Sequence, residues 1–246
     1  MQPTGVAGRT SLVSESRLPA TPAADAYRSA KEWKMTLDVL TGRIGELADA
    51  VLADWRWVRD DLSVSILGMI LYGFATAIGR DMGVTVADVD AAVLRCMTER
   101  VGAAAKWSRG LVAEANASAR DQSHHPGQHE LIGVGRTYHG VGDRRTLVDN
   151  VFANFASVRQ RAGLPEPTVT VFLNPLVMLL AAREREKGAL LSEAEVLEVR
   201  DEAACTQMPL SQAERFYAAL DAQMPIPRLA LERIWDEWQA VREHLV

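Results

Sequence analysis

A stretch of seventeen residues without a charge, from Leu62 to Ile78, constrains the fold of this chain more than any other segment. A helix of that length is at the lower limit for crossing a membrane. Two acidic residues, Asp60 and Asp61, stand directly before it, and serines, glycines and a threonine dilute its apolar character. We therefore predict a buried helix inside a protein core, with a membrane-associated protein as the alternative.

Segments with helical periodicity lie on both sides of this stretch. Apolar side chains recur every three or four positions in residues 22–53, again from Val86 to Ala119, and again in residues 144–161. Each pattern gives a helix one apolar face, and such a face is buried only where other helices cover it. The sequence therefore predicts a mainly α fold with a bundle of three to four long helices.

Shorter helices with sharp ends are predicted in the second half of the chain. Asn174 and the proline after it open an apolar helix, and Pro227 lies at the start of the last one. Ser192 and Ser211 are each followed by a glutamate three residues later, a spacing typical of a capping box at a helix start. We expect a C-terminal subdomain built from these short helices.

The differences along the chain suggest three parts. Residues 1–21 are rich in Pro, Thr, Ser, Gly and Ala and are predicted to be a flexible leader. Residues 22–163 are predicted to form the helical bundle domain, and residues 164–246 the smaller subdomain. Thr168–Phe172 alternates β-branched residues and is expected to be extended. A single core shared by both halves is the alternative.

Residues 121–143 interrupt the helical pattern with five glycines and a proline, so a long loop or hairpin is expected. Four of the five histidines fall in this segment: His124, His125, His129 and His139. A short His-rich tract is one signature of a transition-metal site, with zinc as the first candidate. A solvated loop that binds no cofactor, or one that contacts a partner, is the alternative.

Three arginines lie within or just after the same segment: Arg136, Arg144 and Arg145. A guanidinium group matches the geometry of phosphate and carboxylate, and a helix that starts near Arg144 would add its N-terminal N–H groups. The sequence therefore predicts an anion-binding site here, although the glycine spacing fits neither a dinucleotide fingerprint nor a phosphate loop.

Two tryptophans, Trp235 and Trp238, are three residues apart on the last predicted helix. Tryptophan is common both in cores and as an anchor in interfaces, so we expect core positions, with partner binding as the alternative. The two cysteines, Cys96 and Cys205, each lie in an apolar segment that is predicted to be helical. They are expected to be buried thiols in a reducing compartment.

Composition narrows the function classes. With 27 basic and 32 acidic residues, the chain lacks the basic excess typical of nucleic-acid binders. Neither GxSxG nor HExxH occurs. We therefore predict a cytoplasmic, non-catalytic helical protein that binds another protein, such as a toxin or effector, as an inhibitor, an immunity-type antitoxin or an adaptor. A metal-dependent hydrolase, or another enzyme with its site on residues 121–145, is the alternative. A homo-oligomer is compatible with either function.

Overall fold

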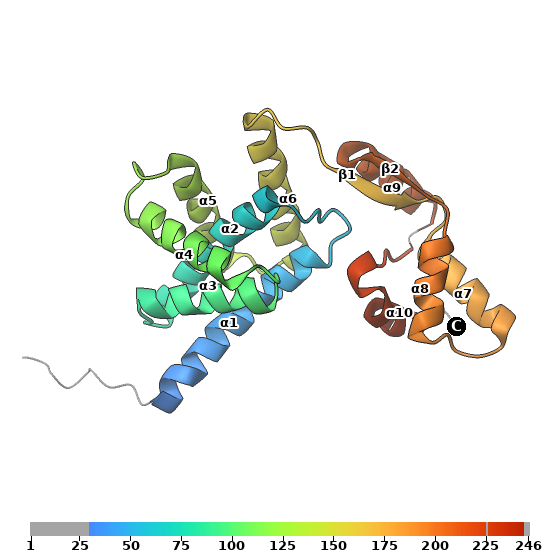
Figure 1. Cartoon of the computed structure of the whole chain (residues 1–246), viewed down its shortest axis with the longest axis horizontal. Helices are drawn as coiled ribbons and strands as arrows, with labels where there is room; N and C mark the ends of the chain where they lie inside the picture. Colours follow the sequence, from blue (N-terminus) through green and yellow to red (C-terminus); the bar gives the residue numbers. More distant parts are fainter. Residues whose placement is uncertain (1–29, 225, 244–246) are drawn as a thin grey trace, which may run out of the picture.

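The computed structural model describes residues 30–224 and 226–243, which form two lobes side by side (Figure 1). The predicted mainly α fold is confirmed, and the predicted leader lies outside the described residues. The N-terminal lobe contains α1 (Ala30–Leu52), α2 (Asp61–Asp81), α3 (Val86–Glu99), α4 (Ala105–Arg120), α5 (Pro126–Thr137) and α6 (Arg144–Arg161). The C-terminal lobe contains β1 (Thr168–Phe172), α7 (Leu176–Lys187), α8 (Glu193–Glu202), β2 (Cys205–Pro209), α9 (Leu210–Gln223) and α10 (Ile234–Arg242).

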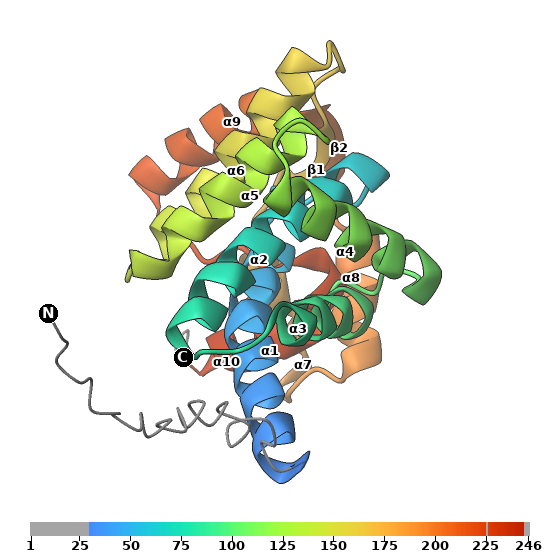
Figure 2. The same ribbon diagram turned by 90° about the vertical axis from the view of Figure 1, so that its left-hand side faces the viewer.

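Helix α2 is the centre of the N-terminal lobe, and the other five helices of the lobe all contact it (Figure 2). Fourteen of its 21 residues are buried. It is the one helix among the described residues that is long and apolar enough to span a membrane, and 78% of its most apolar window is buried inside the protein. The prediction that the uncharged stretch is a buried helix is therefore confirmed.

The start of α2 is fixed by Asp60, which caps the first turn and pairs with Arg159 of α6. Burial of the carboxylate raises its pKa. Hydrogen bonds from the backbone N–H of Ser63, at 2.7 Å, and from the Arg159 guanidinium outweigh that effect, so the pKa of Asp60 is below its ordinary value of 3.8. A lowered pKa in the folded state stabilises the fold at pH values above the pKa of the unfolded chain, and this stabilisation is lost as the pH falls through the folded value.

We expect Asp60→Asn to lower the free energy of unfolding at pH 7 by about 1 kcal/mol, since the pair with Arg159 is only partly buried. Asparagine keeps the helix cap but loses the charge. In urea unfolding the difference between wild type and variant should shrink between about pH 5 and pH 3. Asp61→Asn, at the exposed neighbouring position, is the control. A difference that stays constant over this pH range would contradict the assignment.

Helices α2 and α5 cross with their backbones in contact at two glycines. A Cβ atom on Gly73 would lie 2.0 Å from the carbonyl oxygen of Ile132, and one on Gly135 would lie 2.1 Å from the carbonyl oxygen of Ile70. Any larger residue at either position would overlap backbone atoms. The crossing therefore requires glycine on both helices.

The prediction of a long loop over residues 121–143 is wrong, because α5 and a 3-10 turn at Tyr138–Gly140 occupy most of this segment. Pro126 is the first residue of α5, and the side chain of His125 caps the helix. Proline suits that position, since the N–H it lacks would have no helical partner. The glycines that suggested a loop include Gly135, which allows α5 to approach α2.

The single helix expected from Val86 to Ala119 is also corrected, because α3 and α4 are separate. Gly102 lies between them with a φ of +68°, a conformation that interrupts a right-handed helix. Arg59 donates hydrogen bonds to the carbonyl oxygens of Val101 (2.7 Å) and Gly102 (2.9 Å), which stabilises the turn. Both helices bury an apolar face, so the periodicity continues across the break.

The C-terminal lobe confirms some of the predicted elements and corrects others. The extended segment Thr168–Phe172 is β1, and it pairs antiparallel with β2. Strand β2 is not among the predicted elements, and the expected buried, helical position of Cys205 is wrong, because this cysteine is exposed on the strand. Ser192 forms the expected capping box. Ser211 does not, because α9 already starts at Leu210 and Ser211 donates instead to the Glu166 carboxylate.

The buried apolar side chains form three clusters. The largest lies within the N-terminal lobe, the second is built from α7, α8, α10 and neighbouring residues, and the third, around Val169 and Val171, also contacts Trp55 and Val58. Trp55 additionally packs edge-on against Tyr217 of α9, with ring centroids 4.7 Å apart. The lobes therefore touch through a small apolar contact. The division into domains near residue 164 remains a prediction.

The two free thiols differ in environment. Cys96 is fully buried in α3, and this burial raises the pKa of its thiol to about 12. Since the thiolate is the reactive form, we expect a thiol reagent at pH 8 to modify one cysteine per folded chain and two per unfolded chain. Cys205→Ser should abolish the fast reaction. Rapid labelling of the folded Cys205→Ser variant would contradict the burial of Cys96.

Candidate anion-binding site

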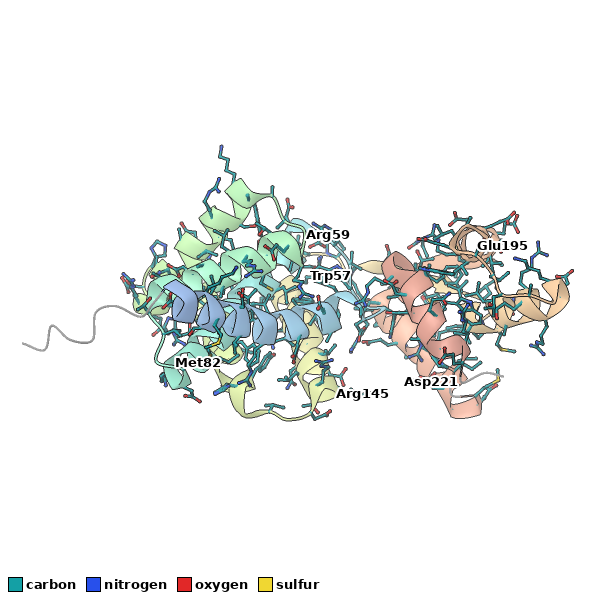
Figure 3. All side chains as sticks on the ribbon, turned by 90° about the horizontal axis from the view of Figure 1, so that it is seen from below. Trp57, Arg59, Met82, Arg145, Glu195 and Asp221 are labelled. Carbon is teal, nitrogen blue, oxygen red and sulfur yellow. The ribbon has the colours of Figure 1, made fainter. Side chains whose placement is uncertain are left out.

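A cleft of about 330 Å³ opens between α2, α3, α4 and α5. Its lining includes Arg80 and Val84, which flank Met82, and Figure 3 places Met82 on the side of the N-terminal lobe away from the C-terminal lobe. Part of the lining is apolar, contributed by Val84, Val86, Val89 and neighbouring small residues. The cleft therefore lies apart from the junction of the two lobes and is built from helices of the N-terminal lobe.

Three arginines reach this cleft from three helices. Arg80 lies in the last turn of α2, Arg120 at the end of α4 and Arg136 in the last turn of α5. Within the described residues, none of the three side chains forms an ion pair or a hydrogen bond. The Nε atom of Arg136 is buried and has no hydrogen-bonding partner there.

The helix dipole accounts for a cation at the end of any one helix, because the last turn carries partial negative charge. It does not account for three such ends meeting at one cleft, which is a consequence of how α2, α4 and α5 pack. Most arginines elsewhere in the described residues are paired with carboxylates, as Arg56 is with Asp54 and Asp149. The lining of the cleft contains no carboxylate.

A hydrogen-bonded network lies beside the arginines. Tyr72 donates its hydroxyl proton to Asp90 Oδ1 at 2.8 Å, and Asn116 Nδ2 donates to Asp90 Oδ2 at 2.7 Å. Burial and the bond to Asp90 raise the pKa of Tyr72, so its hydroxyl stays protonated at neutral pH. Arg120 and Arg136 act in the opposite direction on this pKa, which places both guanidinium groups within electrostatic range of the hydroxyl.

The four histidines of the predicted metal site do not converge. Among the described residues, no group of three or more His, Cys, Asp or Glu side chains is placed to hold a metal ion. Each imidazole instead forms a hydrogen bond with a separate partner. His124 contacts the Glu114 carboxylate, His125 accepts from the backbone N–H of Gln128, His129 contacts the carbonyl oxygen of Ser118, and His139 contacts the Asp81 carboxylate. The first three contacts lie where α4 ends and α5 begins, and the fourth joins the 3-10 turn to the end of α2, so the geometry does not support a zinc site.

The arginines of the predicted anion site are separated in space. Arg136 lines the cleft described above, whereas Arg144 pairs with Glu46 at 3.4 Å. Arg144 and Arg145 both line a second cleft of about 740 Å³ between the lobes. Figure 3 shows Arg145 on one side of this junction and Asp221 on the other. Four arginines and four carboxylates line it, so the second cleft offers no clear preference for an anion.

The sequence analysis missed Arg80 and Arg120 as site residues. Each lies in the last turn of a helix, where a basic residue is common because of the helix dipole. Their spacing along the chain carries no information about their convergence. Only the helix-end position of Arg80 and Arg120 is visible in the sequence, because Arg136 falls in the segment predicted to be a loop, and these positions become informative once the helices are known to pack together.

Both tryptophans lie in α10 and contact the second apolar cluster of the C-terminal lobe. Trp238 is 1% exposed and donates its indole N–H to Glu184 at 3.3 Å. Trp235 is half-buried against the same cluster. Trp238 therefore has the core position that the sequence favoured.

No protein-family model, curated protein or solved structure matches this chain. The assignment of the candidate site therefore depends on its geometry. The deciding features are the convergence of Arg80, Arg120 and Arg136 and the buried donor on Arg136.

Proposed function

We propose that this protein binds a small anionic ligand in the cleft between α2, α3, α4 and α5. The observation that carries the proposal is the set of three arginines that line the cleft without a carboxylate partner in the described residues. Guanidinium groups bind phosphate and carboxylate through paired N–H donors. A buried N–H without an acceptor costs about 1–3 kcal/mol, and an anionic oxygen in the cleft would remove that cost for Arg136.

Inorganic phosphate is the simplest probe of this function. We expect wild-type protein to bind it at one site in isothermal titration calorimetry at constant ionic strength. Ligand at one hundred times its Kd should then raise the free energy of unfolding by about 2.7 kcal/mol. Because phosphate also stabilises proteins nonspecifically, the informative quantity is the difference from Arg136→Gln. Equal stabilisation of both proteins, with no calorimetric binding, would contradict the proposal.

Protein binding, the role predicted from the sequence, is the second candidate. Met35 and Val39 lie one turn apart on α1 and are 63% and 49% exposed. An apolar pair on an exposed helix face would suit a contact with another protein. If this contact carries the function, Met35→Glu combined with Val39→Lys should abolish association with the partner protein while leaving phosphate binding unchanged.

A further inference from the structure

We infer that the ligand of this cleft is a phosphomonoester of a small hydroxylated molecule, of the size of a pentose phosphate. This inference rests on the proposed anion-binding function and adds the chemical class of the ligand. Three features of the cleft support it: the number of guanidinium groups, the volume, and the hydrogen-bonding groups that the arginines do not supply.

The number of arginines favours phosphate over carboxylate. A phosphomonoester carries a charge of about −1.5 to −2 at pH 7 and three strong acceptor oxygens, so it can engage Arg80, Arg120 and Arg136 together. A carboxylate carries one charge on two oxygens, and a single bidentate arginine already uses both. Three arginines around one carboxylate would leave cationic donors without an acceptor.

The volume of the cleft exceeds what a bare phosphate needs. Its 330 Å³ corresponds to about eleven water molecules at roughly 30 Å³ each. Since a phosphate group has five non-hydrogen atoms, about half of the space remains for the rest of the ligand. Valines line part of that space and suit the C–H groups of a sugar ring.

The remaining polar groups of the lining offer acceptors to the ligand. The amide of Asn116 turns its Nδ2 to Asp90, and its Oδ1 accepts no hydrogen bond from the described residues. Thr76 gives its hydroxyl proton to the carbonyl oxygen of Tyr72 at 2.8 Å, which leaves the lone pairs of Oγ1 as acceptors. Groups that accept hydrogen bonds are matched by donors, and the hydroxyls of a sugar supply them.

The test compares ribose 5-phosphate, inorganic phosphate and ribose by calorimetry on the full chain. We expect ribose 5-phosphate to bind wild type at least about tenfold more tightly than inorganic phosphate, because it adds hydrogen bonds and apolar contact. Asn116→Ala and Thr76→Val should each reduce this ratio, and Thr76→Val should leave the Kd of inorganic phosphate within about twofold of wild type. Thr76→Val keeps the shape of the side chain, and Asn150→Ala, at an exposed position on α6, is the control.

The outcomes separate the two proposals. Binding of inorganic phosphate with a ratio near one would overturn the sugar phosphate and leave the anion site in place. Binding of neither phosphate compound would overturn both. A preferred ribose 5-phosphate whose advantage survives both substitutions would overturn the roles given to Asn116 and Thr76, and with them this inference.

Discussion

Gly73→Ala is expected to destabilise the protein by about 3 kcal/mol, the upper part of the range for overpacked cores. A methyl group at this position would lie 2.0 Å from the carbonyl oxygen of Ile132, and backbone on another helix cannot move aside as a flexible side chain can. Gly135→Ala should have a similar effect, since its Cβ would lie 2.1 Å from the carbonyl oxygen of Ile70. Urea unfolding followed by circular dichroism measures both.

Gly133→Ala is the matched control, because Gly133 lies on the same helix as Gly135 and a Cβ there meets nothing within 4 Å. Alanine is the better helix former by up to about 1 kcal/mol, so this variant should be neutral or slightly more stable than wild type. Equal destabilisation by alanine at positions 73, 133 and 135 would show that the effect is not specific to the crossing of α2 and α5.

Removal of two of the three cleft arginines is expected to have the second large effect, on the binding of inorganic phosphate. Arg120→Gln combined with Arg136→Gln should weaken the binding of inorganic phosphate by at least about 100-fold, since each hydrogen-bonded charge contributes about 1.5–3 kcal/mol. Glutamine keeps part of the length and polarity of each side chain. The free energy of unfolding of the ligand-free variant should not fall, because neither arginine is paired with another described residue and the substitution removes the buried Nε of Arg136 that has no partner.

Arg43→Gln combined with Arg109→Gln is the control for net charge. Both arginines are exposed, on α1 and α4, and neither lines the cleft. The control removes the same total charge, so nonspecific attraction would weaken phosphate binding equally in both double variants. Comparable losses would reject the cleft as the binding site.

The helix boundaries show how far local sequence signals reach. The predicted helix from Arg144 to Arg161 agrees with α6, and α7 ends at Gly188. Both boundaries depend on the residues of a single segment. Helix α6 begins after the N-cap Asp143 and has apolar periodicity, and α7 ends at Gly188 because this glycine has a positive φ. Strand β2 could not be recognised in this way, because its pairing with β1 supplies the hydrogen bonds that its own residues do not predict.

The glycines in α5 explain why the loop predicted over residues 121–143 is wrong. Gly133 and Gly135 favour a loop when they are read by propensity, since glycine weakens an isolated helix. In the folded protein the close contact between α5 and α2 compensates, because Gly135 lets the two backbones touch. Burial of Leu131 and Ile132 in the same core adds to this compensation.

The sequence alone determined the mainly α fold and the buried helix over the uncharged residues 62–78, because periodicity and the absence of charge act within a single segment. It also marked Arg136 as a candidate for anion binding. Only the tertiary structure brought Arg80 and Arg120 to the same cleft and gave the four histidines separate partners. The physical reason is that the position of a side chain in space depends on helix crossings, and these are set by contacts between residues far apart in the chain.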